Sequence, residues 1–351
     1  MTDLSTIDVI APNFKKRMSG VTSTVIRLVP LQAREIPIVA TGPKLPADMP
    51  QVSPWKLLTM SRSGPSGPRV WHARRNSEML PGILLRSVLG KRLKLLFTSA
   101  AQRRHSGYTR WLLRRMDAVI ATSAKSGAYL EVPHTVIHHG IDADAFYPAS
   151  DKAAIRKQLG LPEQGKLIGC FGRIRPQKGN DIFVEAMLEV LPKHPDAIAV
   201  MMGGVTDQFQ DFVQALKDKV AAAGLTEQFL FLPEAADWEI TQYFQSLDIY
   251  IAPQRWEGFG LTPLEAMACA VPAVATRVGA FEELIADGET GTLVDIEDTR
   301  AIAAATDALL SDPEKLAAQA SAARDRAAGH FHINTEARAI IDVYRQLLAS
   351  G

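Results

Sequence analysis

The sequence predicts an α/β protein made of two doubly wound parallel sheets, and three observations lead to this prediction. The 351-residue chain is too long for one ordinary core and suits two domains of about 150 to 200 residues each. Short β-branched apolar runs recur along it without alternation, which is typical of buried parallel strands. Longer segments between these runs repeat apolar residues at three and four positions, as amphipathic helices do.

The predicted strands fall into two groups along the chain. The first group contains residues 7–10, 36–40, 69–73, 93–98, 118–122 and 135–139. The second group contains residues 166–171, 197–202, 229–232, 249–252, 272–276 and 292–294. Residues 180–191 and 210–224 show the helical periodicity of the connecting segments most clearly. Strands and helices therefore alternate twice over, once in each domain.

The boundary between the domains is expected within residues 138–151, where turn formers and a proline interrupt the pattern. Residues 1–147 then form the first domain, and residues 148–334 form the second. The last predicted helix, residues 335–350, either stays on the second domain or returns to complete the first. Both placements remain open at the level of sequence.

The composition is that of a soluble globular protein, with 47% hydrophobic and 22% charged residues. No apolar run approaches the roughly 20 residues that cross a bilayer, and the first residues contain no cleavable apolar core, so we expect a cytoplasmic protein. Cys170 and Cys269 lie in apolar runs and have no partners at metal-ligand spacing, which argues against a disulfide framework or a zinc site. We expect both to be core residues.

The net charge of +1 conceals an uneven distribution. Residues 1–147 contain 21 Lys and Arg against 9 Asp and Glu, and the rest of the chain contains 18 against 29. Within residues 60–116, 13 basic residues stand against one acid, Glu78. An anionic partner is therefore expected to dock on this segment.

Two loops that follow predicted strands carry cations and glycines. Ligands of open α/β sheets bind beyond the carboxyl ends of the strands. After residues 166–171, Arg173 and Lys178 flank a proline turn just before a helix, whose N-terminal amides would add to a diphosphate site. Two solvated surface charges are the alternative. Gly203 and Gly204 follow residues 197–202 and either let a ligand approach the backbone or form an ordinary turn.

A third loop, RWEGFGLTPLEA at residues 255–266, contains two carboxylates. Thr262 and Glu265 have the spacing of a capping box, with Pro263 at the first helical position, so Glu265 has a structural explanation. Glu257 lies ahead of that cap, where a carboxylate supports no helix. It is suited to accept hydrogen bonds from sugar hydroxyls.

The glycines of this loop fit the same ligand. Gly258 and Gly260 free the backbone to turn amides toward a phosphate, while Phe259 packs the loop down. A second carboxylate, Glu265, could hold a ribose diol. One sugar at each end of a diphosphate describes a nucleotide sugar, which is the ligand that the three loops predict together.

These residues carry a family resemblance. GRIRPQKG (172–179), followed by PQRWEGFGLTPLEAMACAVPAVAT (253–276), resembles the donor-site signature of the retaining GT-B glycosyltransferases, whose two Rossmann-like doubly wound domains face each other across a cleft. IHHGIDADAFYP (137–148) matches the interdomain segment of that family. Ala270 stands where the family usually has glycine.

The resemblance implies a role for each donor-site residue. Arg173 and Lys178 would bind the diphosphate, Glu257 the transferred sugar and Glu265 the ribose. The remaining donor-site candidates, which come from the same three loops, are Gly172, Gly203, Gly204, Gly258, Phe259, Gly260, Leu261 and Thr262. A retaining transfer uses either a covalent carboxylate nucleophile or a front-face attack, and the resemblance implies the second. It requires neither a metal nor another cofactor, and the chain has no aspartate cluster suited to a metal.

The first domain resembles one subgroup of that family. RVWHARRNSEMLPG (69–82) and KLLFTSAAQRRHSGYTRWLLRRMDAVIATSA (94–124) are similar to the mannosyltransferases that build the inner lipopolysaccharide core in alphaproteobacteria. The implied donor is GDP-mannose, and the implied acceptor is a Kdo-bearing lipid A precursor. That anionic lipid would account for the basic segment and for peripheral contact with the cytoplasmic face of the inner membrane. Tyr108 and Trp111 suit a membrane interface or, alternatively, a core.

The residues that would contact the acceptor are less well marked. Arg74, Arg75, Arg103 and Arg104 are the candidates among the cations, and His72 is the candidate histidine, because His105 lies too late to match the histidine of the family. A packed, hydrogen-bonded strand residue is the alternative for His72.

In the family, the turn after the first strand contacts the donor phosphate and the acceptor and usually contains two glycines. Here only Gly20 is present, with Ser19 as a substitute for the second.

Other functions account for less of the sequence. A nicotinamide-dependent oxidoreductase would need a GxGxxG turn after its first strand, which this chain lacks. A transferase with a UDP-sugar donor or another envelope glycan as acceptor, a sugar-nucleotide epimerase, and a non-catalytic nucleotide-sugar-binding protein remain the alternatives. No nucleic-acid partner is expected.

Overall fold

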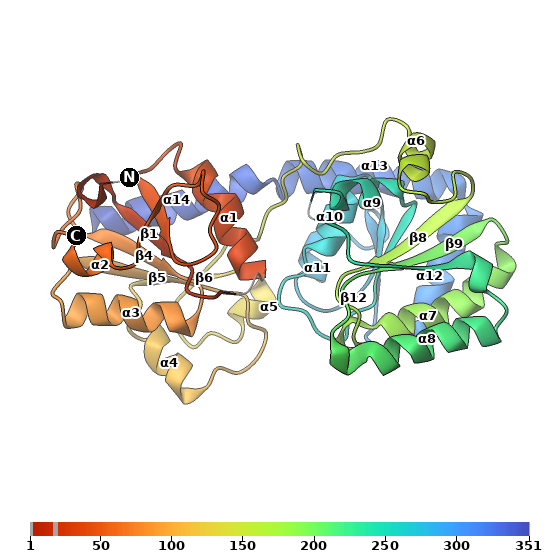
Figure 1. Ribbon diagram of the computed structural model, residues 1–351, viewed down its shortest axis with the longest axis horizontal. Helices are drawn as coiled ribbons and strands as arrows, with labels where there is room; N and C mark the ends of the chain where they lie inside the picture. The colour runs from red at the N-terminus through yellow and green to blue at the C-terminus, as the bar shows by residue number, and fades with distance from the viewer. Residues whose placement is uncertain (1–2, 17–19, 237, 351) are drawn as a thin grey trace. The chain divides into compact units, whose positions relative to one another are not determined.

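Two structural units, each built on one parallel sheet, make up the chain (Figure 1). The computed structural model describes residues 3–16, 20–236 and 238–350. The first unit contains residues 1–140 and 333–351, and the second contains residues 141–332. The predicted α/β class with two doubly wound sheets is confirmed.

The sheet of the first unit has seven strands in the order β3-β2-β1-β4-β5-β6-β7. The chain runs outward from β1 to β3 and then outward from β4 to β7, which is the doubly wound arrangement. Every pairing between these strands is parallel. The strands are β1 (Val9–Pro12), β2 (Ile38–Thr41), β3 (Gln51–Val52), β4 (Arg69–Ala73), β5 (Leu93–Ser99), β6 (Ala118–Ala121) and β7 (Thr135–Val136).

Helices cover both faces of this sheet, because successive strand residues point to opposite faces. Val70 packs in the core under α1 (Gly20–Gln32) and α14 (Ile333–Ala349), whereas Trp71 packs in the core under α3 and α4. The helices between α1 and α14 in this unit are α2 (Lys56–Thr59), α3 (Asn76–Ser87), α4 (Gly107–Leu113) and α5 (Ala124–Gly127). The C-terminal helix thus completes the first unit.

The sheet of the second unit has six parallel strands in the order β10-β9-β8-β11-β12-β13. Its strands are β8 (Lys166–Phe171), β9 (Ala197–Met202), β10 (Phe229–Leu232), β11 (Ile249–Ala252), β12 (Ala273–Thr276) and β13 (Gly291–Val294). The chain leaves β8 on one side and returns beside it as β11, so the strand order reverses between these two strands. In doubly wound sheets this reversal marks the ligand-binding edge.

Helices also cover both faces of the second sheet. One core contains residues of α9, α10 and α13 together with Cys269, and the other contains residues of α7, α8 and α12 together with Cys170. Both cysteines are buried, as predicted. The helices of this unit are α6 (Lys152–Gln158), α7 (Asn180–Val190), α8 (Gln210–Ala222), α9 (Ile240–Ser246), α10 (Thr262–Ala268), α11 (Phe281–Leu284), α12 (Thr299–Ser311) and α13 (Pro313–His330).

Short 3-10 turns link some of these elements. They are Leu4–Thr6, Pro176–Lys178, Leu191–Lys193, Asp207–Phe209 and Thr226–Gln228. No helix in the described part of the chain combines the length and apolarity needed to cross a bilayer.

The division between the units falls at Gly140 and Ile141, seven residues before the expected boundary at 147. Ile141 is completely buried in the core of the second unit. Arg324 of α13 donates hydrogen bonds to the carbonyl oxygens of Ala143 (3.2 Å) and Phe146 (2.8 Å), which hold the intervening segment to the same unit. The backbone crosses back at Phe331, whose carbonyl accepts a 2.7 Å hydrogen bond from the amide of Ile141.

Strand limits differ from the prediction in the first sheet, where β1 and β2 each begin two residues later than expected and the edge strands differ as well. β3 was not expected, because two residues are too few to show a pattern. β7 ends at Val136 rather than at residue 139, and its side chains are exposed, so burial does not extend it. Central strands such as β4 and β8 match the predicted residues.

Candidate active site

A cavity of about 250 Å³ lies at the carboxyl ends of β8, β9 and β10. The loops after these strands and the first turn of α10 form its walls. Its lining residues are Phe171, Gly172, Met202, Gly203, Glu234, Ala235, Ile240, Phe244, Thr262 and Glu265. The structure therefore brings together four residues that the sequence analysis selected from three separate loops, namely Gly172, Gly203, Thr262 and Glu265.

Glycine at position 203 lets two of these loops approach each other. A Cβ atom on Gly203 would lie 1.8 Å from the carbonyl oxygen of Gly172, so any side chain there would force the backbones apart. At the next residue, Gly204, a Cβ would lie 2.6 Å from a carboxylate oxygen of Glu234. The amide of Ile174 donates a 3.1 Å hydrogen bond to the carbonyl of Gly204, which fixes the loop that carries Arg173. The side chain of Arg173 is exposed.

Lys178 and Glu257 form an ion pair, with both side chains mostly shielded from solvent. Lys178 ends the 3-10 turn after β8, and Glu257 lies in the loop after β11, the neighbouring strand. The second carboxylate oxygen of Glu257 accepts a 2.9 Å hydrogen bond from the amide of Gly258. A cation predicted to hold phosphate and a carboxylate predicted to hold sugar are therefore in direct contact.

Arg255 holds these two loops together, a role that the sequence analysis missed. Its guanidinium makes paired 2.8 Å hydrogen bonds to Asp181 at the start of α7, a 2.5 Å bond to the carbonyl of Pro176 and a 2.7 Å bond to Glu297. The arginine immediately precedes the WEGFG sequence, but no motif marks a partner 74 positions earlier. Such a bidentate pair fixes geometry as well as adding energy.

The loop from 257 to 261 is packed against the core of its own unit. Phe259 is buried, as predicted, and its carbonyl oxygen accepts a 3.0 Å hydrogen bond from the amide of Ala280. Gly260 has a φ of 88°, and a Cβ there would lie 2.2 Å from the ring of Phe281. Leu261 is partly buried against the same core. This packing sets the position of Glu257 at the site.

The expected capping box is wrong. Helix α10 begins at Thr262 itself, and the preceding residue is Leu261, whose side chain makes no cap. Pro263 is in the first turn, as predicted. The amide of Glu265 donates to the carbonyl of Leu261 at 2.9 Å, so Glu265 is an ordinary first-turn residue whose side chain lines the cavity. The capping explanation for this carboxylate is removed.

Tyr250 is a second supporting residue that sequence reasoning missed. It is completely buried on β11, and its hydroxyl donates a 3.1 Å hydrogen bond to the carbonyl of Phe171, the last residue of β8. Burial raises the pKa of Tyr250 well above its ordinary value, so the hydroxyl stays protonated and remains a donor. Within the described residues, no group of three or more His, Cys, Asp or Glu could hold a metal ion.

His72 takes the alternative that the sequence left open, that of a packed, hydrogen-bonded strand residue. It is completely buried on β4, with Nδ1 2.6 Å from the hydroxyl of Tyr344 and Nε2 2.7 Å from the hydroxyl of Thr98. Burial, with a smaller contribution from Arg74, holds the pKa of His72 well below its ordinary value of 6.5. A neutral imidazole linking the sheet to α14 is a structural element, because both ring nitrogens are engaged within the protein.

The two arginines after β4 also serve the interior of the first unit. Arg75 donates to Asn13 (2.9 Å), Thr22 (2.9 Å) and Glu78 (2.6 Å), and so ties the loop after β1 to α1 and α3. Arg74 is buried beside His72. Both arginines therefore have structural contacts within the first unit, and their acceptor contacts stay a prediction.

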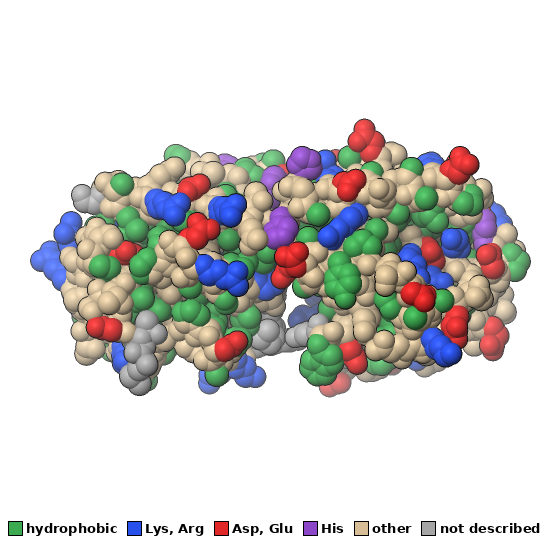
Figure 2. All heavy atoms as spheres, turned by 90° about the horizontal axis from the view of Figure 1, so that it is seen from above, with side chains coloured by type: hydrophobic (Ala, Val, Ile, Leu, Met, Phe, Trp, Pro, Cys, Tyr) green, Lys and Arg blue, Asp and Glu red, His purple; other side chains and the backbone are tan. Residues whose placement is uncertain are grey.

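The remaining candidates in the first unit are exposed. Arg103 and Arg104 lie on the loop after β5, open to solvent. Gly20 is the first residue of α1, and a Cβ there would meet no atom within 4 Å. Ser19 lies outside the described residues. On the face drawn in Figure 2, Lys and Arg side chains lie among Asp and Glu side chains in both units.

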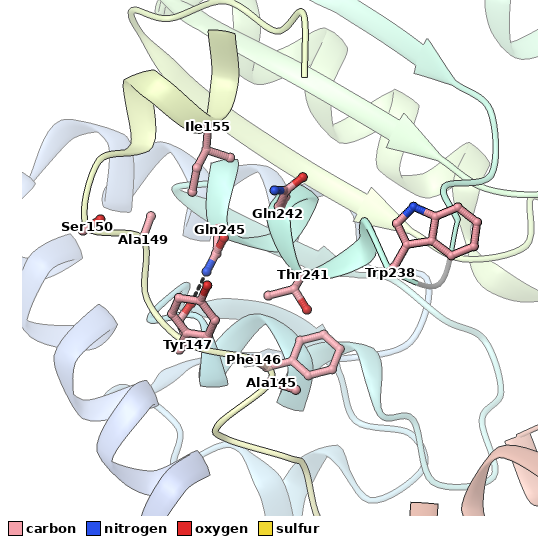
Figure 3. Close-up of a pocket in the computed structure, with 10 residues that line it drawn as sticks. All are labelled: Ala145, Phe146, Tyr147, Ala149, Ser150, Ile155, Trp238, Thr241, Gln242 and Gln245. Atoms are coloured by element: carbon pink, nitrogen blue, oxygen red, sulfur yellow. Dashed lines mark hydrogen bonds between the residues drawn. The ribbon is translucent and has the colours of Figure 1, made fainter. Parts of the chain in front are cut away.

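A second, larger cavity of about 510 Å³ lies on the other side of α9 (Figure 3). Ile240 and Phe244 of α9 line the first cavity, whereas Thr241 and Gln245 line the second. The Gln245 amide donates a 2.8 Å hydrogen bond to the carbonyl of Tyr147, and Trp238 lies at one end of the cavity. No sequence prediction placed a residue there.

Comparisons with known proteins agree with this geometry. The family described as Glycosyl transferases group 1 matches residues 151–326, which include all three loops predicted to bind the donor. The lipopolysaccharide core biosynthesis mannosyltransferase LpsB of Rhizobium meliloti (strain 1021) is 50% identical over 99% of this chain and 100% of its own length. The lipopolysaccharide core biosynthesis mannosyltransferase LpcC of Rhizobium leguminosarum bv. viciae is 49% identical over 100% of this chain and 99% of its own.

Solved structures show the same fold. Anabaena Alr3699/HepE in complex with UDP superposes with a TM-score of 0.83 over 97% of this chain and 100% of its own, at 21% identity. The C-terminal domain of a Francisella tularensis glycosyl transferase group 1 family protein (LpcC) is 38% identical and covers 55% of this chain and 100% of that domain, with a TM-score of 0.53. The GT-B fold expected from the sequence is therefore confirmed. The chain belongs to the glycosyl transferases group 1 family, and the protein is a glycosyltransferase.

Proposed function

We propose that this glycosyltransferase transfers mannose from GDP-mannose, with retention, to the Kdo-containing inner core of a lipid A precursor. The full-length similarity to two proteins named lipopolysaccharide core mannosyltransferases supports the transferred sugar and the class of acceptor. The order of side chains along one edge of the second sheet supports the donor.

That order is the observation on which the proposal rests. In sheet order, β11 and β8 are followed by the Glu257–Lys178 pair, β9 by Gly203 and Gly204, and β10 by Glu234. A nucleotide sugar has the same order of chemical groups: hexose, diphosphate, then nucleoside. Neighbouring strands are about 4.8 Å apart, so the row spans roughly 14 Å. A donor lying along this edge would meet a carboxylate at its sugar, cations and backbone amides at its diphosphate, and a carboxylate at its base.

The proposed reaction keeps the acceptor hydroxyl on the face from which the diphosphate leaves. The bond between the anomeric carbon and the phosphate oxygen breaks, the acceptor oxygen bonds to that carbon, and the acceptor proton passes to the departing phosphate. Lys178 and Arg173 would stabilise the negative charge that develops on GDP. Glu257, released from Lys178 by the phosphate, would accept hydrogen bonds from mannose hydroxyls.

Glu234 favours guanine over uracil in this proposal. A carboxylate only accepts hydrogen bonds, through two adjacent oxygens. Guanine presents two adjacent donors, N1–H and the N2 amino group, whereas the corresponding edge of uracil has one donor between two acceptors. The side chain of Glu234 lies against Gly204 in the cavity, at the end where the base would be.

Titration calorimetry with GDP and UDP tests the base. We expect wild type to bind GDP more tightly than UDP, and Glu234→Gln to lose about ten- to hundredfold in GDP affinity with little change for UDP, since a hydrogen bond to a charged group contributes about 1.5–3 kcal/mol. Glu227→Gln is the matched control, because Glu227 is exposed at the opposite end of β10. Tighter binding of UDP by wild type would contradict the donor assignment.

A transfer assay tests the reaction itself. The purified protein is incubated with labelled GDP-mannose, UDP-glucose or UDP-galactose, with and without Kdo-lipid A. Labelled lipid is expected only from GDP-mannose with the acceptor present. Conversion of one nucleotide sugar into another without an acceptor would instead indicate an epimerase. Donor binding accompanied by neither transfer nor slow hydrolysis of the donor would indicate a non-catalytic protein.

A further inference from the structure

An apolar groove of about 270 Å³ opens on the surface of the first unit. Leu57 and Leu58 of α2 form one wall, and Leu84, Leu85 and Leu89 from α3 and the residues after it form the other. Phe14 and Trp71 complete it, and all of its lining residues are hydrophobic. Nothing in the proposed reaction uses this groove, which belongs to a different unit from the donor cavity.

The rim of the groove is also hydrophobic and open to solvent. Trp55 is 78% exposed and Val88 is 72% exposed, and Leu58, Leu84 and Leu89 are each about half exposed. A single exposed hydrophobic residue is ordinary, but a cluster around an apolar groove usually marks a binding surface.

Cations surround this apolar rim. Lys15 and Lys16, both exposed, follow Phe14 directly. Arg62 and Arg92 are exposed and lie side by side, since the amide of Arg92 donates a 2.8 Å hydrogen bond to the carbonyl of Arg62. Lys91 joins the same two segments through a 2.5 Å hydrogen bond to the carbonyl of Met60.

Acidic residues are few around the groove, where exposed Asp3 interacts with Lys56 of α2. Between residues 49 and 116 the chain has one acid, Glu78. Its side chain is completely buried and bonded to Arg75 and to the amide of Arg74, so it does not offset the surface cations. The charge pattern fits an anionic surface, and the exposed leucines, valine and tryptophan fit an apolar layer beneath that surface.

We propose that the groove and its rim, defined by Leu57, Leu58, Leu84, Leu89, Trp55 and Val88, dock this unit on a bilayer containing anionic lipid. The apolar side chains enter the boundary between headgroups and acyl chains, and Lys15, Lys16, Arg62 and Arg92 contact lipid phosphates. Tryptophan is suited to that boundary because its ring is apolar and its N–H is a donor. The inference deepens the proposed function, because it rests on a lipid-linked acceptor that lies in such a bilayer.

Vesicle sedimentation of the full-length protein tests the docking. Vesicles contain either phosphatidylcholine alone or phosphatidylcholine with about 30% phosphatidylglycerol. We expect binding to the anionic vesicles, weak binding to neutral ones, and release as salt is raised. The double variant Trp55→Ser/Val88→Ser should lower binding at least tenfold. The double variant Arg62→Gln/Arg92→Gln should lower binding to anionic vesicles by about fivefold for each charge removed, and therefore by more than either single substitution.

Trp238→Ser is the matched control, because Trp238 is 83% exposed on the second unit. It should bind vesicles as wild type does. Thermal unfolding and GDP titration of every variant check that each is folded and that its donor site is intact. The vesicle assay contains no donor or acceptor, so its result can be interpreted even if the transfer reaction fails. Absence of wild-type binding to anionic vesicles, or equal losses in the Trp55/Val88 and Trp238 variants, would overturn the docking surface.

Discussion

At the scale of single residues, the Lys178–Glu257 pair links the empty and occupied states of the donor site. In the structure the ammonium of Lys178 neutralises the carboxylate of Glu257. A diphosphate would compete for the same ammonium and leave the carboxylate available to a sugar. In the proposed donor site, binding of the diphosphate by Lys178 would therefore free Glu257 to bind the sugar.

Replacing Lys178 should lower turnover more than stability. If Lys178 acts like one donor of an oxyanion hole, Lys178→Gln lowers kcat about a hundredfold, because the charge on departing GDP loses one counter-charge. Steady-state kinetics with labelled GDP-mannose measure this, and circular dichroism follows folding. Lys219→Gln is the control, since Lys219 also pairs with a glutamate but on the exposed face of α8. Unchanged kcat in Lys178→Gln would exclude the assigned role.

The positions of candidate residues at the sheet edge could be predicted where the sequence signal is local. Lys178 stands in one short motif, Glu257 and Glu265 share another, and the structure places all three at the edge predicted for a ligand. His72 could not be assigned in this way, because its partner Tyr344 lies 272 positions away on another element. The role proposed for Glu234 depends on β10 lying beside β9, which is a property of the strand order.

At the scale of elements, α14 depends on buried polar contacts as well as on apolar packing. Ile340, Ile341 and Tyr344 of this helix are buried under the first sheet, and the Tyr344 hydroxyl meets His72 on β4. Glu336 of the same helix holds His139 (2.7 Å) and the amide of Gly140 (2.8 Å). The helix is therefore tied to the middle strand and to the end of the first segment of the unit.

The stability of the first unit should fall as the pH drops below about 6.5. The pKa of His72 is about 6.5 in the unfolded chain and well below that when folded, because burial excludes the charged form and Arg74 adds repulsion. The unfolded state then binds the proton first, and the free energy of unfolding declines by up to about 1.4 kcal/mol per pH unit until the folded pKa is reached. Urea unfolding at pH 7.5, 6.5, 5.5 and 5.0 measures this slope.

His72→Gln should flatten that slope even though it also lowers stability at pH 7.5. His105 is the comparison, because burial and Arg103 lower its pKa too, but its ring is less buried. His105→Gln should therefore flatten the slope less. Equal slopes in wild type and His72→Gln would show that another group is responsible.

Strands could be predicted where helices cover both faces of the sheet. β4 and β8 match the predicted residues because strands covered on two sides must be apolar throughout. β3 and β7 have two residues each, and pairing at the sheet edge rather than composition defines them. The capping error at Thr262 has a similar origin, because the motif fixes a helix start only to within a residue.

At the scale of the whole molecule, the second unit is inserted between two segments of the first. Its ends are adjacent, since Ile141 and Phe331 share a hydrogen bond and Ile141 pairs with His332. Sequence indicated two domains but left the last helix unassigned, because an amphipathic helix fits either sheet. The structure assigns it through buried Ile333 and Tyr344.

This arrangement makes different predictions for isolated fragments. Residues 141–332 should fold alone, with a cooperative thermal transition and GDP affinity near that of the full chain, because their cores and donor loops are complete. Residues 1–140 should show no cooperative transition, since the α1 side of their sheet lacks α14. A variant in which a short linker joins Gly140 directly to Ile333, so that residues 333–351 are present, should regain a cooperative transition. A cooperative melt of residues 1–140 alone would refute the dependence on α14.

The split first unit has a consequence for biosynthesis. A ribosome adds about 5–20 residues per second, so roughly 10 to 40 s separate the emergence of Gly140 from that of Ile333. During this interval the nascent sheet carries an unfinished apolar face, and the inserted unit becomes complete only at the end, when α13 and His332 have emerged. The unit whose translation starts first is therefore the last whose chain is complete, because α14 follows the whole of the inserted unit.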